Sequence, residues 1–534
     1  MRLVGAWLGI DHTRASRLPG SSPETYVGFA ADVPKRDAIV AAFKHAWHAY
    51  ERDAMGADEY HPISKNGSYL VAAGGIGYTV VDSLDTMLIM GLDDEYRRAR
   101  QWVETELDFD RDGNFNTFET TIRVLGGLLA AYHLTNGDQL YLDKAVELAD
   151  RVLPAFDSGA GLPLSMVNLA RRAGVADRDN SGLVSTAEAT TLQLEFRYLA
   201  ALTDEDIYWR RAEKVMALVR ANRMEPGLVP IYMNPADGRF VSGPVRLGSR
   251  GDSYYEYLLK QYLQTNLSEG VYRDMYSDAV QGVQDYLVQR SMTSGLLYTS
   301  ELIPERAPGG QIAWRQVPKQ DFLVCFFAGT LMLGATRAHA LTGTVSVPPR
   351  KEELTDAGAR DWAVGVGLLE TCLATHDTQT GLAPEIAHFR IPSDKLDSLT
   401  PGYVPRDWYI KGARPGAPAP YDARYMLRPE TVESLLYAYR LTGDGRWRDA
   451  GWRIFEAIEE HCKISSGGYA TIFNVDALPV EHEDKMETFF MSETLKYLYL
   501  LFSDDTVLPL SEYVFNTEAH PLPVFEPTIR TGFT

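Results

Sequence analysis

The chain has 534 residues, of which 45% are hydrophobic and 23% are charged, as in a typical large globular protein. Its formal net charge of -20 argues against nucleic acid as a partner but allows a cation site or a neutral substrate. No run of about 18 or more apolar residues occurs, so the sequence shows no membrane span.

The N-terminal stretch "MRLVGAWLGI" is a short apolar run with one arginine. It is too short to predict a signal peptide, and we expect residues 1–35 to form an N-terminal tail that is poorly ordered or truncated. Two N-glycosylation sequons, at Asn66 and Asn266, support a secretory route only weakly, because chance supplies a few in a chain of this size.

A two-part helical pattern returns along the chain. A segment that is apolar all round ends in a turn, and an amphipathic segment with an aromatic residue near its start follows. Clear copies are "LGGLLAAYHLTNGDQLYLDKAVELADRVL", "LQLEFRYLAALTDEDIYWRRAEKVMALV", "YEYLLKQYLQTNLSEGVYRDMYSDAVQGVQDYL" and "VESLLYAYRLTGDGRWRDAGWRIFEAIEEH". Hairpins repeated at roughly 50 to 80 residues predict an array or a closed toroid.

Seven candidate inner helices, the more apolar members of the hairpins, start near Asp82, Glu119, Glu188, Asp252, Phe327, Glu430 and Glu493. We therefore predict an all-α barrel of seven helical hairpins. Its β elements are expected to be short, such as "GGYATIFNV" (467–475). Residues 36–522 are expected to form this single domain, and residues 523–534 a C-terminal tail.

Six of the seven inner helices carry carboxylates at or near their start: Asp82, Asp85, Glu119, Glu188, Asp252, Glu256, Glu430, Glu433 and Glu493. For any one helix, acids at the N-terminus simply complement the helix dipole. If the hairpins close into a ring, however, the helix starts converge around one cavity, and repulsion makes that costly unless a cation or a reaction needs the acids. Paired carboxylates in a pocket are what glycoside hydrolysis uses, one as acid and one as base.

Two acidic loops also fit the calcium-loop pattern of an EF-hand: "DFDRDGNFNTFE" (108–119) and "DRDNSGLVSTAE" (177–188). Against this reading, the loops start too far apart for paired EF-hands, and each runs directly into a predicted inner helix. An EF-hand calcium sensor and two ordinary polar turns both stay open as alternatives to a catalytic role for these acids.

Taken together, these motifs resemble glycoside hydrolase family 47, the class I α-1,2-mannosidases. The matching stretches run from about residue 36 to 522 and include "DSLDTMLIMGL", "FETTIRVLGGLLAAYHL", "GDSYYEYLLK", "GLAPEIAHF", "LRPETVES", "SETLKYLYLLFSDD" and "FNTEAHPL". The resemblance implies an (α/α)7 barrel, which agrees with the seven hairpins.

The resemblance also implies catalytic roles. Glu119 matches the family's proposed general acid, acting through a water, and Asp252 matches a second candidate acid. Glu430 matches the proposed base that activates the attacking water, and Glu385 matches a further pocket carboxylate of the catalytic set. The family inverts configuration, which needs an acid and a base about 6.5 to 9.5 Å apart.

A calcium site is implied as well. Thr517 matches the family's direct calcium ligand, and the shell would be completed by waters held by Asp82, Glu256, Glu433 and Glu493. Calcium prefers such oxygen ligands. Phe489 matches an aromatic residue that stacks on the scissile sugar, and other sugar-contacting positions match Arg123, Arg250, Arg428 and Glu518. The alternative for these arginines is a local salt bridge with the nearby acids.

Four further positions refine the resemblance. Arg250 is the residue of endoplasmic-reticulum-type members, where Golgi-type members have leucine, and it predicts removal of one specific mannose from the nine-mannose glycan. Cys325 and Cys372 match the family's disulfide pair, which leaves Cys462 free and implies an oxidising lumen. Phe322 departs from the family, which usually has histidine there, so local hydrogen bonding in the pocket is expected to differ.

We therefore expect a calcium-dependent, inverting α-1,2-mannosidase acting on high-mannose N-glycans. We expect it to be monomeric and to reside in the lumen of the endoplasmic reticulum or Golgi, or to be secreted. Two rivals are a degradation-type relative with weak activity and a glycan-binding lectin with a dead site. The cysteine pair argues against the first, and intact Glu119, Asp252 and Glu430 argue against the second.

Overall fold

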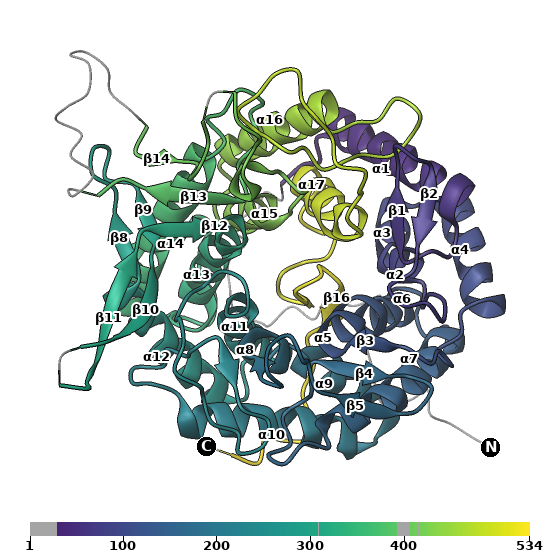
Figure 1. Cartoon of the computed structure of the whole chain (residues 1–534), viewed down its shortest axis with the longest axis horizontal. Helices are drawn as coiled ribbons and strands as arrows, with labels where there is room; N and C mark the ends of the chain where they lie inside the picture. Colours follow the sequence, from purple (N-terminus) through teal and green to yellow (C-terminus); the bar gives the residue numbers. More distant parts are fainter. Residues whose placement is uncertain (1–28, 308, 392–405, 415, 534) are drawn as a thin grey trace, which may run out of the picture.

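Two concentric rings of helices surround a central axis in the computed structural model (Figure 1). The structure describes residues 29–307, 309–391, 406–414 and 416–533. Residues 1–28 of the predicted N-terminal tail therefore lie outside the described residues. Within the described ranges, no helix combines the length and the apolar character needed to cross a membrane.

The inner ring consists of helices that are buried on almost every side. In α11, for example, every residue from Ser253 to Gln264 is buried, as expected of a segment that is apolar all round. The inner helices in chain order are α3 (Leu84–Met90), α6 (Gly126–Leu134), α9 (Gln193–Thr203), α11 (Asp252–Gln264), α13 (Phe326–Arg337), α15 (Glu430–Thr442) and α17 (Leu495–Phe502).

The outer helices each bury one face against this ring. In α7 the buried residues include Tyr141, Ala145, Leu148 and Val152, which recur at helical spacing along one stripe. The outer helices are α1 (Val33–Ala54), α4 (Asp93–Thr105), α7 (Gln139–Val152), α10 (Asp206–Asn222), α12 (Gly270–Tyr286), α14 (Asp356–Ala374) and α16 (Gly445–His461).

The ring closes between the two ends of the chain. Six hairpins join an inner helix to the outer helix that follows it, and the seventh pairs the last inner helix, α17, with the first outer helix, α1 (Figure 1). The predicted all-α (α/α)7 barrel of seven hairpins is thus confirmed for the described part of the chain.

Several inner helices do not begin as regular α-helices. Short turns precede them: α2 (Tyr78–Asp82), α5 (Thr117–Glu119), α8 (Thr186–Ala189) and the 3-10 turn η3 (Phe322–Cys325). Wider π-helical turns, η1 (Thr120–Leu125) and η8 (Phe490–Thr494), lead into α6 and α17. Such turns are frequent at functional sites. Here they carry Arg123 and Glu493, two of the predicted site residues.

Short antiparallel strands line the loops at the ends of the barrel. They are β1 (Glu59–His61), β2 (Asn66–Ser68), β3 (Asn114–Asn116), β4 (Met166–Asn168), β5 (Ala173–Val175), β6 (Val184–Ser185), β7 (Tyr232–Met233), β8 (Val288–Arg290), β9 (Leu297–Thr299), β10 (Glu301–Arg306), β11 (Ile312–Val317), β12 (Lys319–Asp321), β13 (Ile386–Phe389), β14 (Trp408–Tyr409), β15 (Tyr513–Phe515) and β16 (Pro521–Pro523). The stretch 467–475 forms only isolated bridges, at Tyr469 and Ile472, because its partners are single residues of other loops.

The β15–β16 hairpin enters the barrel from the C-terminal end of the chain and lies near its axis (Figure 1). Beyond it, the described part of the predicted C-terminal tail crosses the outside of the ring. There Arg197 of α9 and Glu269 form a buried, bidentate ion pair, and the backbone N–H of Thr531 donates to the same Glu269. The tail is therefore packed on the barrel, and Phe533 lies edge-on against Tyr272 of α12.

The two EF-hand-like loops do not have the structure of an EF-hand. The first lies between α4 and α5 but contains strand β3, which pairs with β4, and the second is preceded by strand β5 and contains strand β6. Their acids are held by neighbouring groups: Asp112 accepts from Asn168 and Arg171. Since an EF-hand is a helix–loop–helix unit, this geometry argues against the calcium-sensor alternative.

Candidate active site

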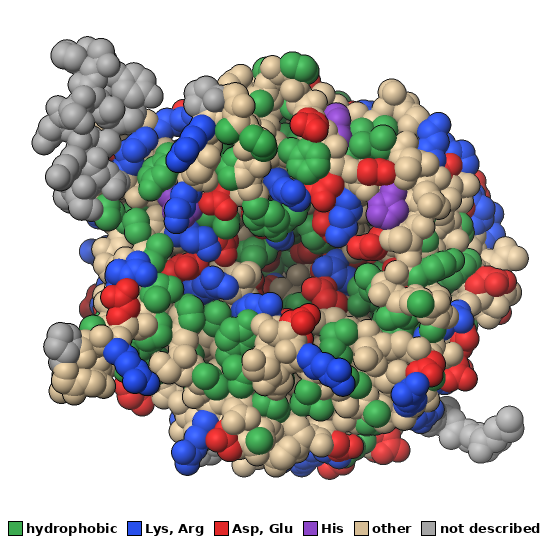
Figure 2. All heavy atoms as spheres, in the orientation of Figure 1, with side chains coloured by type: hydrophobic (Ala, Val, Ile, Leu, Met, Phe, Trp, Pro, Cys, Tyr) green, Lys and Arg blue, Asp and Glu red, His purple; other side chains and the backbone are tan. Residues whose placement is uncertain are grey.

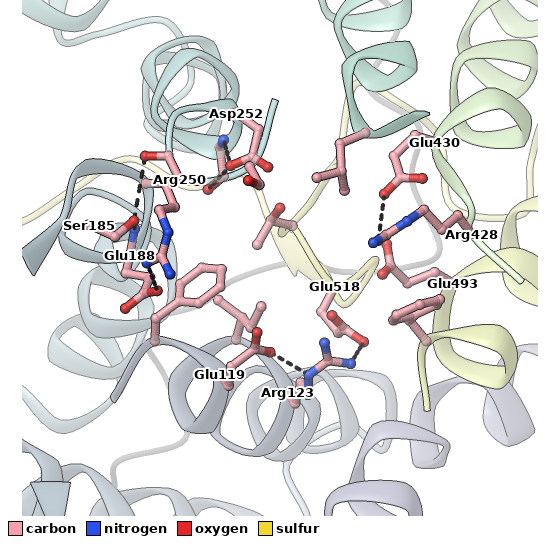
Figure 3. Close-up of a pocket in the computed structure, with 18 residues that line it drawn as sticks. Glu119, Arg123, Ser185, Glu188, Arg250, Asp252, Arg428, Glu430, Glu493 and Glu518 are labelled. Carbon is pink, nitrogen blue, oxygen red and sulfur yellow. Dashed lines mark hydrogen bonds and ion pairs between the residues drawn. The ribbon is translucent and has the colours of Figure 1, made fainter. Parts of the chain in front are cut away.

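The inner helix starts surround a cavity of about 340 Å³. Figure 2 shows the centre of this face hollowed and bordered by charged side chains, and Figure 3 shows the side chains that line the hollow. Its polar lining includes Glu119, Arg123, Glu188, Arg250, Asp252, Arg428, Glu430, Glu493, Thr517 and Glu518, with Phe489 among the apolar residues.

Glu119 lies at the end of α5 and is held in place by an arginine one helical turn later. Arg123 donates from Nε to Glu119 at 2.7 Å and from Nη1 to Glu518 at 2.5 Å. The Glu119 side chain is 36% exposed, whereas Arg123 is largely buried. Glu119 is thus an oriented carboxylate that solvent and a ligand can reach.

Asp252 is the first residue of α11, and its carboxylate accepts a hydrogen bond from the N–H of Ser253 at 2.8 Å. Burial and the charges of Glu256 and Glu430 raise the pKa of Asp252 to about 7. A carboxyl group with a pKa of about 7 can gain or lose a proton near neutral pH.

Glu430 begins α15 on another side of the cavity from Asp252 (Figure 3). Burial raises the pKa of Glu430 to about 7, with Arg428 opposing the rise and Glu385 and Glu256 adding to it. Arg428 lies 3.9 Å from Glu430 and donates two hydrogen bonds of 2.7 Å to Glu385. The acids at the start of this helix thus belong to a shared electrostatic site and do more than complement a helix dipole.

The floor of the cavity is the loop between β15 and β16. Thr517 donates from Oγ1 to Glu256 at 2.8 Å. The side chain of Asn516 fixes the loop, because its Oδ1 accepts from the N–H groups of Glu518 and His520 while its Nδ2 donates to Glu195 at 2.7 Å. The loop therefore presents Thr517 and Glu518 to the cavity from a rigid base.

A fully buried charge network lies behind this loop. Lys496 donates to Asp85 and to the carbonyl of Ala519, both at 2.8 Å. His520 bridges Asp85 and Asp82 at 2.9 and 3.0 Å. Burial would lower the pKa of His520, but the two carboxylates outweigh it and raise the pKa above its ordinary value. The network ties the C-terminal loop to α2, α3 and α17.

Four predicted site residues lie behind the cavity wall and do not line it. Glu385 contacts the cavity-lining Arg428, and Glu256 contacts the cavity-lining Thr517. Asp82 contacts Arg123 and His520. The fourth, Glu433, pairs with Lys260, which also contacts Glu256. Sequence reasoning did not single out Lys260, Lys496 or His520. Only for Lys260 was a local signal present, since it lies four residues after Glu256 on one helix.

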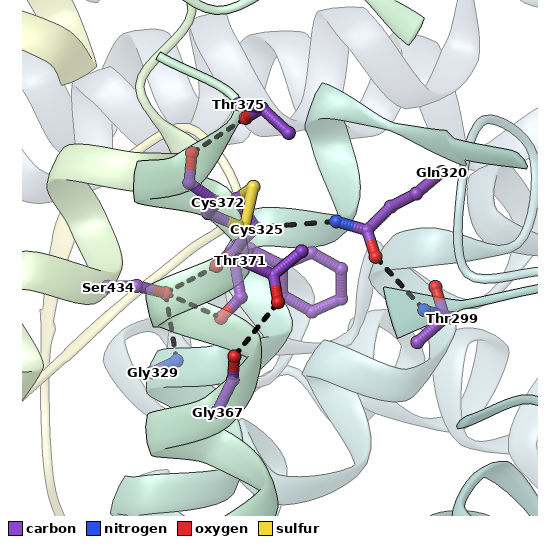
Figure 4. Close-up of a disulfide and its surroundings, with 10 residues drawn as sticks. Thr299, Gln320, Cys325, Gly329, Gly367, Thr371, Cys372, Thr375 and Ser434 are labelled. Carbon is purple, nitrogen blue, oxygen red and sulfur yellow. Dashed lines mark hydrogen bonds between the residues drawn. A yellow bond between two sulfur atoms is a disulfide. The ribbon is translucent and has the colours of Figure 1, made fainter. Parts of the chain in front are cut away.

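The predicted disulfide between Cys325 and Cys372 is confirmed (Figure 4). It joins η3 to α14, with the two Cα atoms 5.9 Å apart, and Cys462 is buried and free. Phe322, in the same turn, packs edge-on against His376 and Tyr425. Its backbone N–H donates to the carbonyl of Glu385 at 2.8 Å, so this position still supports a pocket carboxylate.

Comparison with known proteins decides the family. The family model of Glycosyl hydrolase family 47 matches residues 42–524. The chain belongs to glycosyl hydrolase family 47. It is therefore a glycosidase, and the family predicted from its motifs is confirmed.

Individual relatives agree with this assignment. The chain is 46% identical over 505 residues to a mannosyl-oligosaccharide 1,2-alpha-mannosidase of Candida albicans, covering 92% of this chain and 84% of the relative. It is 41% identical over 523 residues to the endoplasmic reticulum mannosyl-oligosaccharide 1,2-alpha-mannosidase of Schizosaccharomyces pombe, covering 96% and 93%. Among solved structures, the alpha-1,2-mannosidase from Trichoderma reesei superposes with a TM-score of 0.78 at 27% identity, covering 93% and 100%.

Proposed function

We propose that this chain is a calcium-dependent, inverting α-1,2-mannosidase that removes terminal mannose from high-mannose N-glycans. One observation carries the proposal: Asp252 and Glu430 face one cavity from different helices, and each has a pKa raised to about 7. Groups that titrate near the operating pH are suited to general acid and base catalysis.

The reaction follows from these positions. Glu430, ionised, takes a proton from a water that attacks the anomeric carbon of the bound mannose. A proton delivered by Glu119 through a water, or by Asp252, reaches the glycosidic oxygen as the bond from the anomeric carbon to that oxygen breaks. Because attack and departure occur on opposite faces, α-linked mannose leaves as the β anomer. Arg123 and Arg428 hold Glu119 and Glu385 in fixed orientations.

A calcium ion fits the chemistry of the cavity floor. Burial raises the pKa of Glu493 well above its ordinary value, and the charges of Glu518, Glu430 and Glu433 add to the rise, so a nearby cation would stabilise the ionised form of Glu493. A buried Oε1 of Glu433 has no hydrogen-bond partner. In the proposed site Thr517 is the direct ligand, and Asp82, Glu256, Glu433 and Glu493 act through waters, a set of oxygen ligands of the kind that calcium prefers. When bound, calcium would supply charge stabilisation and orient sugar hydroxyls.

The arginine at the cavity rim supports a narrow specificity. Arg250 lines the cavity with its side chain 36% exposed, so its forked donors are available to sugar hydroxyls. We infer that it selects one mannose, so that a nine-mannose glycan becomes a single eight-mannose isomer. The disulfide suits an oxidising compartment, and we propose the secretory lumen as the site of action of a monomeric enzyme.

Digestion of a nine-mannose N-glycan, with and without a calcium chelator, tests the proposal. A single eight-mannose product that disappears on chelation is expected. A mixture running down to five mannoses would overturn the role of Arg250 but keep the activity. Glycan binding without cleavage would contradict the proposed enzymatic activity and would favour a glycan-binding protein.

A further inference from the structure

Arg250 occupies an unusual backbone position. Its φ angle is +74°, a left-handed conformation that is uncommon for a residue with a side chain. Its carbonyl accepts from the N–H of Ala187 at 2.9 Å, which ties it to α8. Strained backbone of this kind persists where the surroundings over-determine it, and it clusters at ligand sites.

The guanidinium of Arg250 has two neighbours that can direct it. The carboxylate of Glu188 lies 3.9 Å away, too far for a direct hydrogen bond, so it attracts the charge without fixing its direction. The ring of Tyr232 lies against the guanidinium, 5.3 Å from ring centre to Cζ, within the range of a cation–π contact. Tyr232 reaches this place because β7 pairs with β6, with Tyr232 opposite Ser185.

Tyr232 is itself held by the loop that resembled an EF-hand. Its hydroxyl donates to Oδ1 of Asn180 at 2.7 Å. The Nδ2 of Asn180 donates to the carboxylate of Asp177, and the other oxygen of that carboxylate accepts from the N–H of Asp179 at 2.9 Å. The loop closes on itself, because the N–H of Gly182 donates to the carbonyl of Asp177 at 2.7 Å.

The carboxylate of Asp177 is thus used within the loop. The amide of Asn180 is the main cause that lowers the pKa of Asp177, and the charge of Arg250 contributes. The polar residues that match a calcium loop therefore form a turn, and this turn places the amide oxygen of Asn180 next to the hydroxyl of Tyr232.

We propose that loop 177–183 is a positioning element for substrate selection: Asn180 fixes Tyr232, and the Tyr232 ring directs the Arg250 guanidinium into the cavity. The inference rests on the proposed function and deepens it. A long side chain that must be ordered on binding costs affinity, and holding it beforehand removes that cost. Loss of the tyrosine ring should therefore weaken selection of the correct mannose and leave the acids and base in place.

The test uses the full chain and a nine-mannose N-glycan, with Tyr232→Leu, Tyr232→Phe and Asn180→Ala. Tyr439→Leu is the matched control, because Tyr439 also packs against an arginine, Arg448, at 4.1 Å but outside the cavity. Tyr232→Leu should raise KM by about 2-fold to 10-fold, with a smaller change in kcat, and should release additional isomers. Tyr232→Phe keeps the ring and should rescue most of the selectivity.

The two partners of the hydroxyl contact should behave as one unit. Asn180→Ala and Tyr232→Phe should both have small effects on selectivity, and adding Tyr232→Phe to Asn180→Ala should cause no further loss, because the same hydrogen bond is already absent. Wild-type KM and isomer pattern in Tyr232→Leu would overturn the positioning role while the proposed function stands. Parallel loss of kcat and thermal stability, as large as in Tyr439→Leu, would also overturn it. If the unmodified chain does not cleave the glycan, the proposed function falls and this role falls with it.

Discussion

Replacing Lys496 with methionine should destabilise the protein by about 3 to 5 kcal/mol. Lys496 and Asp85 are both fully buried, with 2.8 Å between Nζ and Oδ2. Lys496, His520, Asp85 and Asp82 together carry no net charge when His520 is protonated. The raised pKa of His520 favours this protonated state. Removing the lysine leaves one buried negative charge uncompensated, and that desolvation cost dominates the loss.

Urea unfolding of matched variants measures this effect. Lys463→Met is the control, since Lys463 and Glu459 are 2.6 Å apart but partly exposed, and such a pair contributes about 1 kcal/mol or less. Lys496→Met combined with Asp85→Asn should be more stable than Lys496→Met alone, because the orphaned charge is gone. Equal losses for Lys496→Met and Lys463→Met, or no recovery in the double variant, would refute the reasoning.

Three more predictions concern catalysis, pH and the disulfide. Glu430→Gln should lower kcat by about 10²-fold to 10⁴-fold with glycan binding retained in calorimetry, and unchanged turnover would contradict its role as base. The pKa of buried His376 falls to about 4 from an ordinary 6.5, so its folded state resists protonation. The contribution of neutral His376 to the free energy of unfolding is therefore complete above pH 6.5 and falls by about 3 kcal/mol toward pH 4. In acid unfolding titrations, His376→Phe should lack this part of the pH dependence. The double variant Cys325→Ala, Cys372→Ala removes a cross-link between residues 47 positions apart. Its free energy of unfolding, measured with denaturant, should be about 4 kcal/mol lower, because the unfolded chain gains entropy. A decrease below about 1 kcal/mol would contradict a stabilising role of the disulfide.

The barrel was predictable because its signals are local. Inner and outer helices differ in how many of their faces are apolar, and the pattern survives in each hairpin copy. Acids such as Glu430 and Asp252 stand at helix starts, so ring closure alone brings them to one cavity. The resemblance to the family independently predicted that Glu430 and Asp252 belong to the active site.

The rest depends on contacts between distant residues, which no local pattern encodes. Lys496 and Asp85 are 411 positions apart, and the seventh hairpin joins α1 to α17 across the whole chain. The positions of most short strands were not predicted, because strands of two to six residues carry little or no periodic signal. The loop around Asn180 matched a calcium-loop pattern as well as an ordinary turn, because the same residue types that bind calcium also make turns.

Proton nuclear magnetic resonance of the sugar first released from a nine-mannose glycan tests the central claim most directly. If Glu430 activates a water opposite the leaving group, the initial product is β-mannose, which later mutarotates, and Glu430→Gln releases it about 10²-fold to 10⁴-fold more slowly. Initial release of α-mannose would contradict the account, because it would require a covalent or same-face mechanism that this assignment of acid and base excludes.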